Sequence, residues 1–265
     1  MATRLIGPSK PRVDFEKSDF DRLIREKGYR VMWQAAELCP CRLNGDTDQP
    51  DPSCLICDAS GYVYVFPDPL EPELDDYTRE KPPFVSTATE RATQGILTSM
   101  THDPQIFEKF GEWLSGTAAI TTFSWNKVGH RDRFKVLDHT QVYRQAIIVP
   151  PSQVIPVKRA NREALRYPAV KLRRVFAVAA GAVTTDYTEA TTIQADGSLL
   201  VTAPPGTRLS VSYEMNPIWV VVDYPHIIRG TLIRFKTTKV LGFNEVLPIQ
   251  AMVRLDYLVS EGKEL

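Results

Sequence analysis

The four cysteines of this chain are the residues with the clearest chemical signature. Cys39, Cys41, Cys54 and Cys57 follow the pattern C-x-C-x12-C-x2-C, and the sequence contains no other cysteine. C-x2-C is the spacing at which a tight loop brings two sulfurs to one metal ion. In a strand, residues i and i+2 point the same way, so Cys39 and Cys41 would offer both sulfurs to one face. Four thiolates fill a tetrahedral coordination shell, which predicts structural zinc rather than a catalytic metal.

Other chemistries remain open for the same four residues. The first pair is C-x-C and departs from the double C-x2-C pattern of a zinc ribbon, so an iron–sulfur cluster is an alternative. Two disulfides or four free thiols are further alternatives. Disulfides need an oxidising compartment, and the segment from Met1 to Arg12 lacks the apolar stretch of a secretory signal. We therefore predict a metal site.

No catalytic motif accompanies the cysteines. The sequence lacks the glycine-rich phosphate-binding patterns, the H-E-x-x-H zinc motif and the G-x-S-x-G serine motif. We interpret its scattered histidines as surface or hydrogen-bonded residues, and the kinase-like triplet His130-Arg131-Asp132 as a chance match because the other kinase motifs are missing. These observations predict that the protein is not an enzyme.

The elements that would position the cysteines form a helix and a β-hairpin. Ser18 can cap a helix that Gly28 ends. Tyr29, Val31 and Trp33 then alternate with polar neighbours as in a strand, and Gly61–Phe66 provides the returning strand. Beyond the hairpin only residues 104–114 suggest a helix, and Asp196-Gly197 marks a hairpin turn. Strand patterns predominate, at 117–125, 134–137, 145–149, 175–179, 199–201, 209–213, 219–222, 231–235 and 249–257.

The predicted fold is mainly β. An N-terminal helix and a four-cysteine, metal-bound β-hairpin precede a β-barrel, and a small β-sandwich-like domain interrupts the barrel. No apolar stretch is long enough to span a membrane. The predicted segments are 1–66 (N-terminal arm, helix and metal hairpin), 67–83 (acidic linker), 84–164 (first part of the barrel), 165–217 (inserted domain) and 218–265 (second part of the barrel).

The charges balance overall but are unevenly distributed. Lys+Arg and Asp+Glu number 32 each, which is not typical of a general nucleic-acid binder. Asp68–Asp76 carries five acids, whereas Lys158–Arg174 carries seven bases against one acid. These runs are either solvated faces, complementary surfaces on neighbouring copies, or, for the basic run, a face turned toward nucleic acid. If the two runs are complementary surfaces on neighbouring copies, we expect charge reversal at Arg173 and Arg174 to abolish assembly.

Three stretches resemble structural proteins of tailed-bacteriophage virions. The runs CPCR and CLICDASGYVYV resemble the cysteine hairpin near the N-terminus of some of these proteins. The run DGSLLVTAPPGTRLSVSYEMNPIWVVVDYPH resembles the β-rich segments of phage neck and tail proteins, and GHRDRFKVLD resembles a strand entry of their β-barrels. The resemblance implies a head-to-tail connector or neck protein.

Such a protein would act by assembly. The resemblance implies a homo-oligomeric ring around the DNA channel that joins the portal to the tail, with portal, adaptor and tail proteins as partners and non-specific contact with channel DNA. The protein would reside in the virion neck or tail, after assembly in the host cytoplasm. The alternative is a cellular zinc-ribbon module that binds protein or nucleic acid, with Trp33, Tyr62 and Tyr64 stacking on bases.

Overall fold

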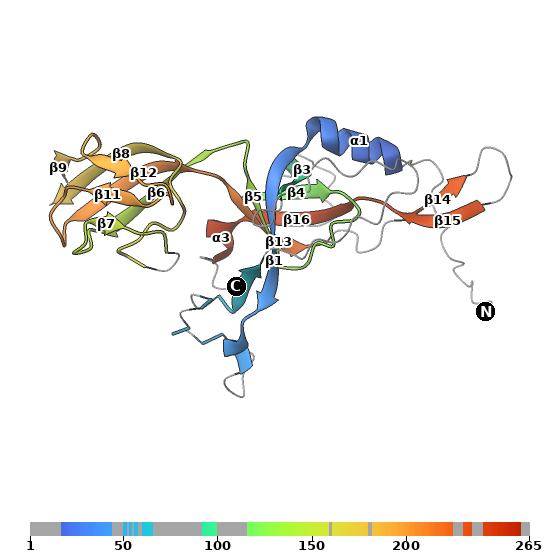
Figure 1. The fold of residues 1–265 in the computed structure, drawn as a ribbon, viewed down its shortest axis with the longest axis horizontal. Coiled ribbons are helices and arrows are strands. Elements are labelled where there is room, and N and C mark those ends of the chain that lie inside the picture. The colour runs from blue at the N-terminus through green and yellow to red at the C-terminus, as the bar shows by residue number, and fades with distance from the viewer. Residues whose placement is uncertain are drawn as a thin grey trace, which may run out of the picture. The chain divides into compact units, whose positions relative to one another are not determined.

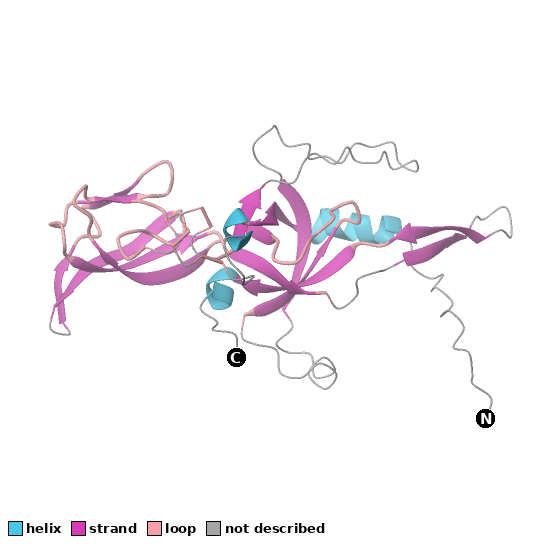
Figure 2. Cartoon of the chain, turned by 90° about the horizontal axis from the view of Figure 1, so that it is seen from below, coloured by secondary structure: helices cyan, strands magenta, loops and turns pink. Residues whose placement is uncertain are grey.

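The computed structural model confirms a mainly β chain with a short N-terminal helix (Figures 1 and 2). The predicted N-terminal arm, acidic linker and helix at 104–114 lie outside the described residues. Among the residues that are described, no helix is long and apolar enough to cross a membrane. The structure describes residues 17–43, 50–51, 53–54, 56–57, 60–65, 92–99, 116–158, 161–179, 182–224, 230–234 and 241–260.

The N-terminal helix leads directly into the first strand. Helix α1 (Lys17–Lys27) buries Ile24, and the Gly28 N–H closes the helix on the Ile24 carbonyl at 2.8 Å. The helix includes Ser18 in its first turn, so Ser18 is not the cap that we predicted. Strand β1 (Tyr29–Leu38) buries Val31, Met32 and Trp33 in succession instead of alternating. Consecutive burial means that both faces of β1 are covered at this point.

Six strands close into a β-barrel, which confirms the predicted barrel. Strand β1 pairs with β3 on one side and with β5 on the other, so it belongs to the barrel as well as to the cysteine segment. The prediction had placed β1 only in the hairpin module and had missed β3. Around the barrel the order is β1, β3 (Ala92–Ser99), β4 (Thr117–Thr122), β16 (Ile249–Leu255), β13 (Ile218–Asp223) and β5 (Arg133–Val136).

A buried carboxylate links β1 to other segments of the barrel by hydrogen bonds. Asp132 is 3% exposed. One of its oxygens accepts hydrogen bonds from the Trp33 indole Nε1–H at 2.8 Å and the Gly129 N–H at 2.7 Å, and the other accepts from the Ala36 N–H at 2.9 Å. The Asp132 backbone carbonyl also accepts from the Val221 N–H of β13. Asp132 therefore connects three segments of the barrel and has a structural role.

A second polar group joins the C-terminal helix to the hairpin. Strand β2 (Tyr62–Val65) is the hydrogen-bonded neighbour of β1. Arg133 forms an ion pair with buried Asp256 at 3.1 Å, and its guanidinium lies over the Tyr64 ring, 3.3 Å from the centroid. Asp256 begins helix α3 (Asp256–Ser260), so the strand predicted over 249–257 ends at Leu255. Strands β14 (Gly230–Arg234) and β15 (Leu241–Val246) form a separate hairpin.

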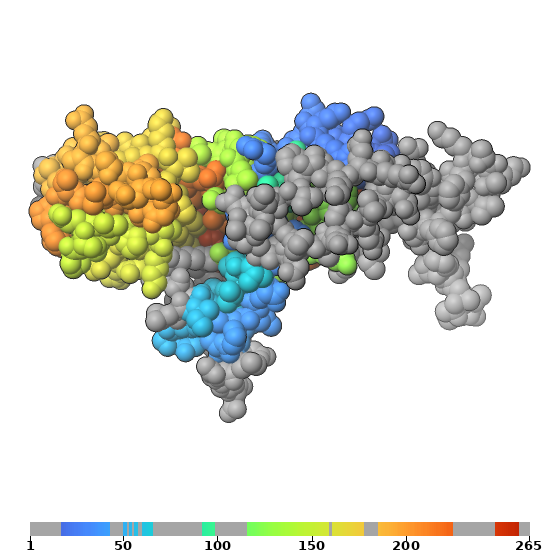
Figure 3. Space-filling view, viewed as in Figure 1, coloured from blue at the N-terminus to red at the C-terminus, as the bar shows by residue number. Residues whose placement is uncertain are grey.

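Residues 135–217 contain two further sheets and belong to a second compact unit, together with residues 37–63. Strand β12 alternates as predicted, burying Leu209, Val211 and Tyr213. Figure 3 shows β7, β8, β10, β11 and β12, coloured lime to orange, gathered together. The first sheet has the strand order β6 (Gln141–Ile148), β12 (Arg208–Met215), β8 (Lys171–Ala179) and β9 (Ala182–Asp186). The second has the order β10 (Thr191–Ile193), β11 (Leu199–Val201) and β7 (Val154–Ile155).

The longer segment of this unit begins at Lys135, whereas the sequence suggested a boundary at residue 165. The reason is long-range pairing, since β6 pairs with β12 along its whole length, from Gln141↔Met215 to Ile148↔Arg208. The predicted turn at Asp196-Gly197 is confirmed. Gly197 has φ of 81°, and the strands on either side of it, β10 and β11, pair.

We expect Asp132→Asn to destabilise the barrel by about 3 kcal/mol, because the amide removes a charged acceptor and turns an NH₂ group toward a bound N–H donor. Denaturant unfolding followed by tryptophan fluorescence would measure the change. The control is Asp223→Asn, an exposed carboxylate at the end of β13, which should alter stability by less than about 0.5 kcal/mol. Equal stability of the two variants would contradict the role assigned to Asp132.

Candidate metal centre

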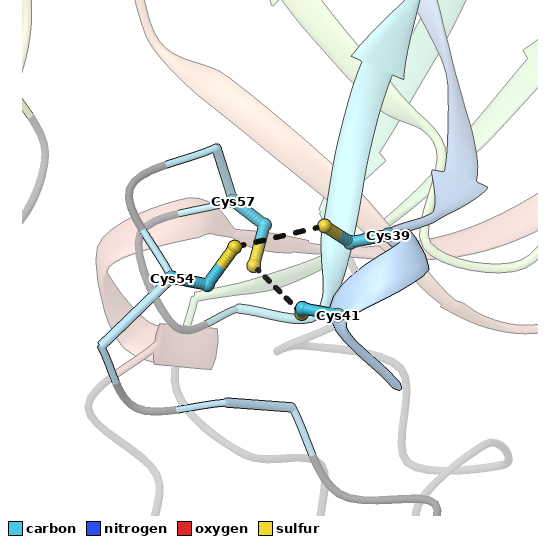
Figure 4. A group of neighbouring side chains, drawn as sticks. All are labelled: Cys39, Cys41, Cys54 and Cys57. Atoms are coloured by element: carbon cyan, nitrogen blue, oxygen red, sulfur yellow. Dashed lines mark hydrogen bonds between the residues drawn. The ribbon is translucent and has the colours of Figure 1, made fainter. Parts of the chain in front are cut away.

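The four cysteines predicted to form one site converge in the structure. Their Sγ atoms all lie within 4.8 Å of one another, and all four are free thiols. The Cys39 and Cys54 sulfurs are 3.8 Å apart, and those of Cys41 and Cys57 are 3.6 Å apart. Figure 4 shows the sulfurs turned toward a common centre, with one pair coming from each side. Cys39, Cys41 and Cys57 are buried, and Cys54 is partly exposed.

The first pair reaches the centre through a helical turn and not through a strand. Strand β1 ends at Leu38, and Cys41 lies in the 3₁₀ turn η1 (Pro40–Leu43). The Arg42 N–H donates to the Cys39 carbonyl at 3.1 Å, which brings the chain back on itself. Our prediction that Cys39 and Cys41 share one face of a strand was therefore wrong in its geometry. Pro40 suits this position because its fixed φ favours the first residue of a helical turn.

The second pair lies in a tight loop closed by backbone and hydroxyl groups. The Ser60 hydroxyl donates to the Cys57 carbonyl at 2.6 Å, and the Gly61 N–H points to the Cys57 sulfur at 3.3 Å. Gly61 has φ of 73°, in the left-handed region that favours glycine. Its carbonyl accepts from the Cys39 N–H at 2.9 Å, so this residue joins the two cysteine loops directly.

Backbone N–H groups and burial give the thiols different acidities. The N–H groups of Cys57 and Ile56 lower the pKa of the Cys54 thiol to about 7. Burial raises the pKa of the Cys41 and Cys57 thiols. Cys54 therefore ionises most readily near neutral pH, whereas the buried thiols need a compensating cation to ionise.

The donor set fits a tetrahedral metal ion. A metal–sulfur distance of ~2.3 Å corresponds to sulfur–sulfur edges of ~3.8 Å. The two pairs at 3.8 and 3.6 Å already have this spacing, and the widest separation of 4.8 Å requires a contraction of only about 1 Å. Four thiolates would leave no position for water or substrate, so a metal held here would organise the chain rather than catalyse a reaction.

Sequence reasoning found the ligands but missed the residues around them. Arg42 lies over the Tyr62 ring, 4.8 Å from the centroid, and a Cβ at Gly61 would approach the Arg42 Nε to 2.6 Å. The Ser60-Gly61 pair is a turn signal that could have been recognised. His130 contacts the Val222 carbonyl at 3.2 Å and is exposed, as expected for a surface residue. His102 and His226 lie outside the described residues.

We expect Cys54→Ser to abolish metal binding and to unfold the loop from Cys39 to Tyr62. Structural zinc contributes on the order of 10–16 kcal/mol of apparent binding free energy in small modules, far more than this loop could replace. Elemental analysis should find one zinc per wild-type chain and none in the variant. Ile56→Ala is the matched control, because Ile56 lies between the ligands and is 73% exposed. Wild-type protein without zinc or iron would contradict the site.

Acidification should release the metal, because protons compete for the thiolates. The lowered pKa of Cys54, about 7, means that its thiolate is present above this pH and is lost as the pH falls through it. The buried thiols, with raised pKa values, take up protons at higher pH still. A bound metal ion stabilises all four thiolates and lowers the pH at which they take up protons, so a chromophoric zinc indicator should report little release at pH 8 and progressive release as the pH falls below about 6. Retention at pH 4 would contradict this expectation.

Comparisons with known proteins do not identify a family for this chain, so the interpretation of the site rests on its geometry. No protein-family model matches the chain, and no curated protein matches it significantly.

Proposed function

We propose that this protein is a structural subunit that works by assembly, namely a ring-forming neck or head-to-tail connector protein of a tailed-phage virion. The observation that carries the proposal is the cluster of four sulfurs within 4.8 Å, a closed donor set suited to stabilising a loop. A metal-stapled loop of this kind provides a rigid contact surface without a large core of its own. The chain acts by binding its neighbours and not by catalysis.

The three stretches that resemble phage neck proteins coincide with distinct structural features. The cysteine runs build the metal centre. The run from Gly129 to Asp138 contains Asp132 and strand β5, and the run from Asp196 to His226 contains β11, β12 and β13. We interpret the two sheets of residues 135–217 as the layers of a small sandwich. Buried side chains from both sheets, such as Val211 and Leu199, support this interpretation.

We propose zinc as the metal, and as partners other copies of the chain, portal or adaptor proteins and tail proteins. The virion neck is then its location. The alternative, a cellular zinc-ribbon module, needs free aromatic rings for base stacking. Trp33 is 5% exposed and hydrogen-bonded to Asp132, and the Tyr62 and Tyr64 rings lie beneath Arg42 and Arg133. These contacts favour structural roles for the three aromatic residues.

The zinc-loaded chain should form rings with a central channel. Negative-stain electron microscopy at increasing protein concentration, together with light scattering for mass, would test this. Removal of zinc by a chelator should weaken the rings if the cysteine loop contributes to the contact. A chain that remains monomeric with and without portal protein would overturn the proposed function.

A further inference from the structure

The outer face of the sheet formed by β6, β12, β8 and β9 is exposed and rich in arginine. On β12, the residues that alternate with buried Leu209 and Val211 are Arg208, Ser210, Ser212 and Glu214. The pairing registers place residues of the neighbouring strands beside these β12 residues. Arg144 of β6 and Arg174 of β8 both lie opposite Ser212, one on each side. Because adjacent strands are ~4.8 Å apart, the two arginines project from points about 10 Å apart.

This basic face draws residues from three strands that are distant in sequence. Its exposed basic side chains are Arg144, Lys171, Arg173, Arg174 and Arg208. A register shift at Ser212/Tyr213 places both Arg173 and Arg174 on the face. Only part of the basic run from Lys158 to Arg174 contributes, because Arg166 lies over the Tyr167 ring and Lys158 lies between β6 and β8, outside the strands of the sheet.

The basic face keeps unsatisfied charge. Arg173 pairs with Glu214, and Arg174 lies 3.9 Å from Asp186, yet both arginine side chains stay more than half exposed. Neither Arg144 nor Arg208 makes an ion pair with any residue that the structure describes. Five bases against two acids leave a net positive surface, which attracts a partner carrying negative charge.

The composition of the face favours a peptide over nucleic acid. Exposed Val142 and partly exposed Phe176 offer apolar contacts between the bases, which a peptide with apolar side chains can use and a phosphate backbone cannot. Protein interfaces are enriched in arginine and aromatic residues. A nucleic-acid surface would instead present a continuous basic patch.

We propose that this basic face binds the acidic segment 68–76 of a second copy of the chain. The inference rests on the proposed assembly function and gives it a specific contact. The segment reads DPLEPELDD, with five acids, no base and apolar Leu70 and Leu74. Its charge and its leucines both complement the face.

The segment also has the spacing that a sheet face can recognise. The sequence places acids at every second position, Glu71, Glu73 and Asp75. Arginines of the face that project about 10 Å apart have side chains long enough to reach more than one of these carboxylates. The contact is heterologous, since each copy offers one segment and one face, so successive copies can close a ring.

Charge-swap variants of the full, zinc-loaded chain would test the contact by sedimentation velocity at 150 mM salt. Arg144→Glu/Arg174→Glu and, separately, Glu71→Lys/Glu73→Lys should each weaken self-association at least tenfold. Combining all four substitutions should restore it, because the pairing is then reversed and not removed. Lys158→Glu/Arg162→Glu is the control, with the same charge change at exposed positions outside the sheet.

A mixture of the two association-deficient variants distinguishes docking between copies from docking within one copy. Each variant retains one intact half of the contact, and the two reversed halves complement each other, so the mixture should regain the self-association that neither variant shows alone. Three results would each overturn the proposal: the face variant associates as strongly as the wild-type chain, the fourfold variant does not regain association, or the mixture stays monomeric. If the wild-type chain binds duplex DNA and the face variant alone loses this binding while self-association is unchanged, the face is a nucleic-acid surface. That result would also overturn the proposal.

The failure of this inference differs from the failure of the proposed function. If rings form but the face variant forms them equally well, the contact is wrong and the assembly function stands. If the wild-type chain is always monomeric, the assembly function fails. Fluorescence anisotropy of a labelled peptide of residues 66–80 then decides. The proposed contact is supported if the wild-type chain binds the peptide and the Arg144→Glu/Arg174→Glu chain does not. It is overturned if the wild-type chain does not bind the peptide.

Discussion

The barrel depends on one buried negative charge. A carboxylate moved out of water loses several kcal/mol of hydration free energy unless hydrogen bonds replace that hydration. At Asp132 the indole of Trp33 and the backbone N–H groups of Ala36 and Gly129 provide the replacement. Because two of these donors lie on β1, the same contact fixes where β1 leaves the barrel. The first cysteine, Cys39, follows Ala36 by three residues in the sequence.

Features encoded by neighbouring residues were predictable from the sequence. The alternation of Leu209, Val211 and Tyr213, the Asp196-Gly197 turn and the grouping of the four cysteines all have short-range signals. Strand β3 was missed because Gly95 interrupts it. A Cβ at this glycine would approach the Ile120 Cδ1 to 3.1 Å, a close contact that no local pattern reveals.

The remaining misses come from contacts between distant residues. That residues 135–164 belong to the second compact unit follows from the pairing of β6 with β12, sixty or more residues later in the chain. The basic face likewise depends on register, because Arg144 and Arg208 join Arg174 only when three strands align. For the metal site, the ligand identities were readable but the 3₁₀ turn at Pro40–Leu43 was not, since C-x-C is compatible with either a strand or a turn.

The Val136 N–H donates to the Pro217 carbonyl at 2.9 Å, so the two ends of the inserted unit lie side by side. This has a consequence for the order of folding. Closing β5 onto β13 across some eighty unstructured residues costs about 2.5 kcal/mol more conformational entropy than closing a loop of five, at ~0.6 kcal/mol for each doubling of loop length. An insertion that folds first brings its own ends together and removes this penalty. The barrel therefore closes most readily around an insertion that is already folded.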